Sequence, residues 1–96
     1  MITRTDLRLS ALRAFLHRVH PEMRVIKVAL KDQEIFLTVV IECEPTERIR
    51  EDVSKAATEI ISDFPDLEFH ERFEVIRGAL ALEDIFEEGW IYARAE

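Results

Sequence analysis

Residues 34–76, EIFLTVVIECEPTERIREDVSKAATEIISDFPDLEFHERFEVI, decide the fold of this 96-residue chain. Residues 34–43 are rich in β-branched side chains and predict a strand. Thr46 is a suitable N-cap for a helix that continues to Pro65. The apolar stripe of this helix has a period of 3.6: Ile49, Val53, Ala56, Ala57, Ile60, Ile61 and Phe64. From Phe69 to Ile76 the period returns to two, so we expect a second strand, parallel to the first across a right-handed crossover.

The N-terminal third adds a helix and a further strand. Residues 6–20 have helical periodicity, with Thr5 as the expected N-cap and Pro21 as the stop. The apolar stripe of this helix is expected to be buried: Leu7, Ala11, Leu12, Phe15, Leu16 and Val19. Residues 23–30 predict a strand that forms a hairpin with residues 34–43 across Lys31-Asp32-Gln33. Because residues 34–43 have apolar side chains on both faces, we expect that strand to be central.

The C-terminal part leaves alternatives open. Residues 78–82 are compatible with a loop or a strand, and residues 83–88 with a helical turn, while residues 90–94 predict a short fourth strand or a docked end. The predicted fold is α+β in the order α-β-β-α-β-(β), a two-layer sandwich with two helices on one face of a three- or four-stranded mixed sheet. A chain of this length builds one core, so residues 1–96 are expected to form a single domain.

The charge of the chain is uneven. The net charge is −7, with seven Arg/Lys against two Asp/Glu in residues 1–31 and six against eighteen in residues 32–96. An acidic body repels phosphate groups, so nucleic acid and anionic membranes are excluded as expected partners, and a basic protein is favoured. The alternative is that the excess acid serves only solubility.

Nothing in the sequence predicts a membrane span or secretion. The longest apolar run, residues 35–41, is about a third of the ~20 residues that a membrane helix needs. Charged residues occur within the first six positions, and the N-terminal stretch lacks the apolar region of a signal peptide. A single cysteine, Cys43, forms no internal disulfide, which fits a reducing compartment. We therefore expect a cytoplasmic protein.

The titratable residues do not combine into a catalytic or metal site. Two glycines in the whole chain leave no phosphate-binding loop. His17 and His20 lack the further ligands of a zinc site, and we interpret them as favourable charges at a helix C-terminus. Cys43 and His70 are the one conceivable nucleophile and base, but strand alternation places them on opposite faces. We expect no enzymatic activity, no cofactor and no metal.

Two surfaces remain as candidate binding sites. The first is an acidic cluster with two aromatic neighbours: Glu83, Asp84, Glu87, Glu88, Trp90 and Tyr92. Like charges four residues apart repel one another, and a basic partner would relieve that repulsion. The alternative interpretation is a solvated loop.

The second candidate is the face of the sheet that carries no helix. Its expected members are Phe36, Thr38, Val40, Arg72, Glu74 and Ile76, joined by Trp90 and Tyr92. An uncovered face of this composition is typical of a protein interface, including a homodimer or an assembly subunit. If the C-terminal residues fold across the face, the same residues are ordinary core.

Three segments carry a resemblance to a known group of proteins: LRLSALRAFLHRVHPEMRV (7–25), EPTERIREDVSKAATEIISDFP (44–65) and GWIYARAE (89–96). They resemble small bacterial proteins that include the immunity proteins of contact-dependent and other polymorphic toxin systems. The resemblance implies a cytoplasmic protein that neutralises a toxin domain by occluding it, with acidic residues against a basic cleft, and it transfers no catalytic motif. We therefore expect a non-enzymatic acidic binding module, with a structural homo-oligomer as the alternative.

Overall fold

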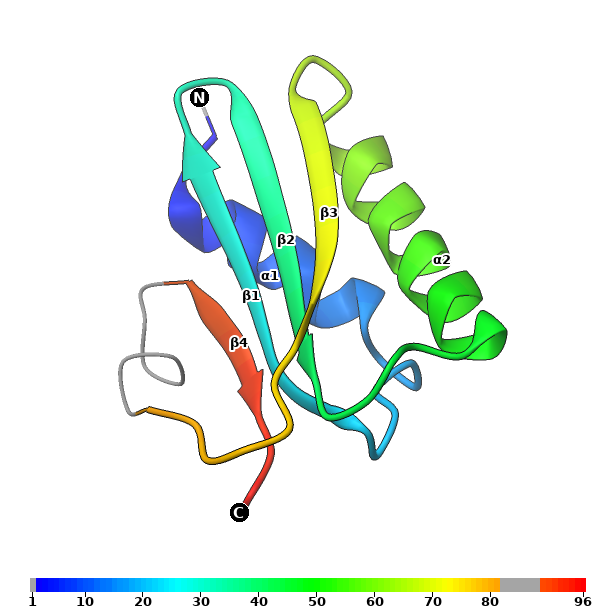
Figure 1. Cartoon of the computed structure of the whole chain (residues 1–96). Helices are drawn as coiled ribbons and strands as arrows, with labels where there is room; N and C mark the ends of the chain where they lie inside the picture. The colour runs from blue at the N-terminus through cyan, green and yellow to red at the C-terminus, as the bar shows by residue number, and fades with distance from the viewer. Residues whose placement is uncertain (1, 82–88) are drawn as a thin grey trace.

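The computed structural model describes residues 2–81 and 89–96, and it confirms the predicted α+β sandwich. Two helices lie on one face of a four-stranded sheet (Figure 1). The elements are, in chain order, α1 (Arg4–Ala14), β1 (Met23–Lys31), β2 (Glu34–Ile41), α2 (Glu47–Asp63), β3 (Glu68–Val75) and β4 (Trp90–Ala93). Among the described residues, no helix is both long and apolar enough to cross a membrane.

The sheet has the strand order β3-β2-β1-β4. β2 is antiparallel to β1 and parallel to β3, as the βαβ pattern predicts, and it is flanked on both sides. β4 adds an antiparallel edge next to β1 and makes the predicted fourth strand. The sheet therefore brings the C-terminal residues beside the first strand of the chain.

The core lies between the sheet and the helices. α2 begins after the predicted cap, Thr46, whose hydroxyl accepts a hydrogen bond from the Ile49 amide at 3.2 Å. Apolar side chains of α2 and of one face of β1 and β2 are fully buried: Val53, Ala56, Ile60, Ile26, Leu37, Val39 and Ile41. Burial of one large aliphatic side chain contributes about 1.5–3 kcal/mol, so this layer fixes the position of α2.

The predicted bounds of α1 are wrong at both ends. Thr3, and not Thr5, is the N-cap, because Thr3 and Asp6 exchange two hydrogen bonds of 3.0 and 3.1 Å in a capping box. The helix ends at Ala14 and not at residue 20, since the chain turns after Phe15 and His17 takes a positive φ of 64°. Leu12, Leu16 and Val19, which were expected in the buried stripe, are 41%, 63% and 39% exposed.

Candidate partner-binding site

The predicted acidic cluster, Glu83, Asp84, Glu87 and Glu88, lies outside the described residues. Described residues before and after this cluster are hydrogen-bonded to β1. Before it, the carbonyls of Ile76 and Gly78 each accept a hydrogen bond of 2.6 Å from Nη1 of Arg24. After it, the carbonyl of Gly89 accepts one of 2.9 Å from the Val28 amide. Both flanks of the acidic segment are therefore held by the sheet.

Trp90 and Tyr92 are half-buried on the edge strand β4. Tyr92 is paired with Ile26 and packs against the core under the helices, so its expected place on the open face is wrong. The Arg8 guanidinium of α1 lies over the Trp90 ring, 5.6 Å from its centroid. Trp90 therefore contacts α1 at the edge of the sheet, and Tyr92 lies on the same side of the sheet as the core.

An ion-pair network fixes the C-terminal end beside this edge. Glu96 accepts hydrogen bonds from Arg24 at 2.6 and 2.7 Å and from Arg94 at 3.0 Å. Arg94 also donates to Glu42 at 2.8 Å. The Arg24 hydrogen bonds, followed by those from Arg94, lower the pKa of Glu96 from 4.5 to about 2. Glu96 in turn raises the pKa of Arg24.

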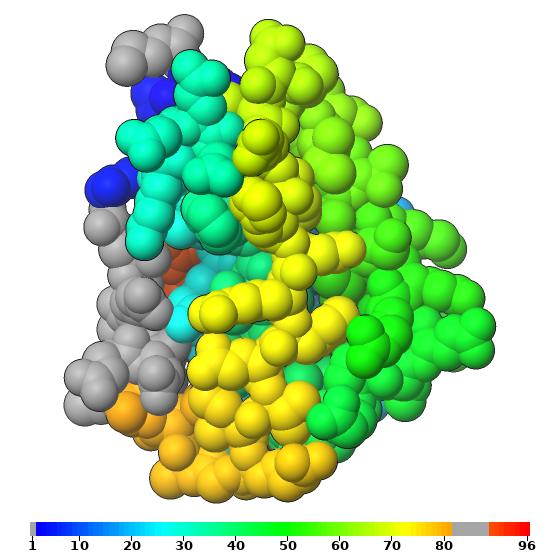
Figure 2. Space-filling model, turned by 45° about the horizontal axis from the view of Figure 1, so that its top comes forward, coloured from blue at the N-terminus to red at the C-terminus, as the bar shows by residue number. Residues whose placement is uncertain are grey.

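The open face of the sheet is less apolar than predicted. Val25 and Val40 belong to this face by strand alternation, yet they are 0% and 1% exposed. Of the residues expected on this face, Val40 is therefore a buried core residue, as one of the alternatives above expected. The exposed part forms a hollow of about 450 Å³, seen in Figure 2 between β3 and the β1–β2 hairpin. Cationic side chains share its lining with Phe36, Thr38 and His70: Lys27, Lys31 and Arg72.

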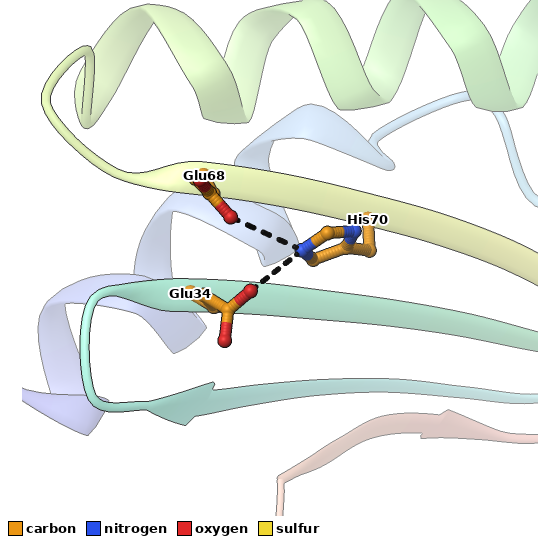
Figure 3. Close-up of side chains that lie close together, drawn as sticks. All are labelled: Glu34, Glu68 and His70. Atoms are coloured by element: carbon orange, nitrogen blue, oxygen red, sulfur yellow. Dashed lines mark hydrogen bonds and ion pairs between the residues drawn. The ribbon is translucent and has the colours of Figure 1, made fainter.

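His70 is the centre of a polar cluster at one end of this face (Figure 3). Its ring stacks on Phe36, with centroids 4.9 Å apart, because the parallel register pairs these two residues. Its Nε2 lies 3.1 Å from a Glu34 carboxylate oxygen and 3.8 Å from one of Glu68. These ligand-type atoms lie within 4.8 Å of one another, so they are the place in the described chain where a divalent ion would find three donors.

The cluster differs from a built metal site in burial and ligand number. The side chains of Glu34, Glu68 and His70 are 41%, 75% and 48% exposed. Structural zinc sites are enclosed and have four protein ligands. The imidazole–carboxylate contacts account for the arrangement without an ion, and the absence of a metal site stays a prediction.

The structure also places His20 and Cys43, two residues considered above for metal binding and catalysis. His20 does not cap a helix, since α1 ends before it; its Nε2 lies 2.6 Å from Oδ2 of Asp52 on α2 and lowers the pKa of that carboxyl. Cys43 lies beyond the end of β2, while His70 is paired with Phe36 near the start of that strand. The extended chain from Phe36 to Ile41 alone spans about 16 Å, and Cys43 lies beyond it, so Cys43 and His70 cannot act as nucleophile and base.

Sequence reasoning missed one surface, the outer side of α1. Leu9 and Leu12 lie opposite the buried residues Leu7 and Ala11, and Leu9 is 55% exposed. The signal was present, because Leu9 does not fit the helical stripe to which Leu7 and Ala11 belong.

The comparison with known families identifies the chain. Residues 4–96 match the family model described as MafI2 immunity protein. The chain belongs to the MafI2 immunity protein family. The matched range contains every helix and strand of the fold, and the predicted resemblance to immunity proteins of toxin systems is confirmed. A search of curated proteins gave no match. Membership of the MafI2 family implies a toxin as the partner of this domain.

Proposed function

We propose that the chain is a non-enzymatic cytoplasmic inhibitor that occludes a basic cleft of its toxin. The observation that carries the proposal is the MafI2 immunity family match over nearly the whole chain. The contacting residues are the acidic cluster and the two aromatic residues after it: Glu83, Asp84, Glu87, Glu88, Trp90 and Tyr92.

The charge distribution supports this choice of surface. Residues 32–96 carry eighteen acidic against six basic side chains, and four of those acids fall within six consecutive positions. Complementary charge accelerates association and disfavours wrong partners. The described residues Gly78 and Gly89, which lie on either side of these acids in the sequence, are each hydrogen-bonded to β1.

The experiment begins with affinity purification from the native lysate and identification of the retained toxin by mass spectrometry. The toxin domain is then purified in an inactive form, and its affinity for the chain is measured by calorimetry at low and high salt. We expect reversal of Glu83, Asp84, Glu87 and Glu88 to lysine to weaken binding by about tenfold or more and to flatten its salt dependence.

A matched control separates local contacts from net charge. Reversing four exposed acids elsewhere, at Glu44, Glu47, Glu51 and Asp66, produces the same change in net charge and should alter affinity less. Equal losses in both variants would reject the acidic cluster as the contact. A wild-type chain that binds no toxin would reject the inhibitor function.

Self-association through the open sheet face is the alternative function. Because Val40 is buried, Phe36 is the apolar side chain at the hollow that such a contact would use. Sedimentation tests this alternative. It would be favoured if the wild-type chain is a dimer and Phe36→Glu is a folded monomer.

A further inference from the structure

The outer side of α1 presents leucines to solvent. Leu9 and Leu12 are 55% and 41% exposed, and Leu16, in the turn after the helix, is 63% exposed. Leu9 and Leu12 are three residues apart on the same side of α1, and Leu16 follows them along the chain just beyond the end of the helix. The opposite side of α1 already packs on the core through Leu7, Ala11 and Ala14. The leucine row, defined as Leu9, Leu12 and Leu16, is therefore an apolar surface that the fold itself does not use.

Arginines border the leucine row on both sides. Arg8 lies one helical turn before Leu12, and Arg13 one turn after Leu9. Both are exposed, with 73% of the Arg13 side chain accessible, and Arg13 forms a surface ion pair of 3.5 Å with Asp63 of α2. Asp6 is the one acidic residue within α1, and the capping box with Thr3 already engages it. The row therefore has a cationic rim in a chain whose net charge is −7.

The rim argues against a second copy of the chain as the occupant. A two-fold contact between leucine rows would bring Arg8 and Arg13 near the same arginines of the other copy, and Asp63 of α2, which lies beside Arg13, would offset only part of that positive charge. Docking of the row onto the acidic half of another copy is head-to-tail and would form a ring or an open chain of copies, not a closed two-fold dimer. A different protein with an apolar hollow surrounded by carboxylates would bind the leucines in the hollow and pair its carboxylates with the arginines.

The leucine row also adjoins the proposed acidic contact. Arg8 on its rim lies over the ring of Trp90, the first residue of β4. One partner can therefore contact both the leucine row and Trp90. We infer that the leucine row and its arginine rim form a second contact with the toxin, made to an apolar hollow edged by carboxylates; this inference rests on the proposed function.

The test uses the inactive toxin domain and a pair of matched variants. Leu12→Glu places a charge in the row, and Ile61→Glu places one on α2 at almost the same exposure, 41% against 42%. We expect Leu12→Glu to weaken toxin binding by about tenfold or more, as for a residue at the centre of an interface, and Ile61→Glu to leave it within about twofold. Thermal unfolding of both variants confirms that they are folded.

A charge variant tests the rim. Arg13→Gln should weaken binding and reduce its salt dependence, whereas Arg48→Gln on α2 should change neither. Toxin binding that survives Leu12→Glu and Arg13→Gln overturns this inference and leaves the proposed function intact. A wild-type chain that binds no toxin overturns both. A wild-type dimer in sedimentation that Leu12→Glu disperses would assign the row to a second copy instead.

Discussion

Arg24 and Glu96 form a two-point contact across 72 residues of sequence. Nε and Nη2 of Arg24 donate to the two carboxylate oxygens of Glu96 at 2.7 and 2.6 Å. The Arg24 side chain is 6% exposed, and its Nη1 binds the carbonyls of Ile76 and Gly78. One guanidinium thus joins β1, the segment after β3 and the C-terminal residue. Two parallel hydrogen bonds between a guanidinium and a carboxylate are stronger than hydrogen bonds between neutral groups.

Replacement of the carboxylate should make the fold less stable in a pH-dependent way. Because the pKa of Glu96 is lowered from 4.5 to about 2, its contribution is complete above pH 4.5 and is lost as the pH falls toward 2. We expect Glu96→Gln to reduce stability at neutral pH, and the difference from wild type to shrink below pH 4.5. Urea unfolding across that range measures it, with the exposed Glu44→Gln as control. A difference that does not vary with pH would contradict the role of the ion pair.

The two glycines of the chain should respond differently to alanine. Gly89 has a φ of +94°, and a Cβ there would lie 2.1 Å from the Val28 carbonyl oxygen, whereas Gly78 has open space around it. Gly89→Ala should therefore destabilise the protein by about 1–3 kcal/mol, since both strain and the close backbone contact oppose the new side chain. Gly78→Ala should be near neutral. Chemical denaturation measures both, and equal effects would argue against the Gly89 geometry.

The two threonines at the start of α1 distinguish the observed helix boundary from the predicted one. The Thr3 hydroxyl accepts a hydrogen bond from the Asp6 amide, while Thr5 lies inside the first turn of α1. Thr3→Ala should cost about 1 kcal/mol of unfolding free energy, and Thr5→Ala less than half of that. The measurement is thermal unfolding of both variants. A larger loss at Thr5 would restore the boundary predicted from sequence.

Adjacent isoleucines on α2 test the position of the core. Ile60 is fully buried against the sheet, and Ile61 is 42% exposed. Ile60→Ala should lower the free energy of unfolding by about 2–5 kcal/mol through lost burial and a cavity. Ile61→Ala should lower it by about 0.5 kcal/mol, as at other surface positions. Denaturant titrations give both values, and similar losses would mean that α2 is rotated from its assigned orientation.

Zinc tests the polar cluster of Glu34, Glu68 and His70. An ion that binds only the folded state would raise the unfolding temperature, because at an ion concentration c it stabilises that state by RT ln(1 + c/Kd). Because the cluster is exposed and has three donors, we expect excess Zn²⁺ to leave the unfolding temperature unchanged. A rise that occurs in wild type and disappears in His70→Ala would show a metal site. His17→Ala is the control, since His17 lies outside the cluster.

Local patterns predicted most of the fold. Thr46 and Pro65 mark the ends of α2 because a cap and a proline act on backbone groups within a few residues. The β-branched composition of residues 34–43 and the alternation of residues 69–76 predicted two strands, and the helix between them predicted that they are parallel. The same reasoning failed for the end of α1. The apolar spacing continues to residue 20, but the helix ends before the turn that contains His17.

The candidate site was less accessible to sequence reasoning. The acidic cluster, with Trp90 and Tyr92, was found from charge and composition, and its role stays a prediction. The burial of Val40 and the place of Tyr92 under the helices depend on which segments cover each face and on a bulge in the β1–β4 register. The exposure of Leu9 and Leu12 depends on which side of α1 packs inward.

The sequence by itself therefore determined the types and order of the first five elements, the α+β class and the uneven charge, because these depend on neighbours close along the chain. The tertiary structure decided the contacts between distant residues, such as Arg24 with Glu96 and His20 with Asp52. It also decided which apolar residues remain in solvent, the leucine row above all. The physical reason is that strand register and helix rotation are fixed by the packing of the whole core, and no short stretch of sequence contains that information.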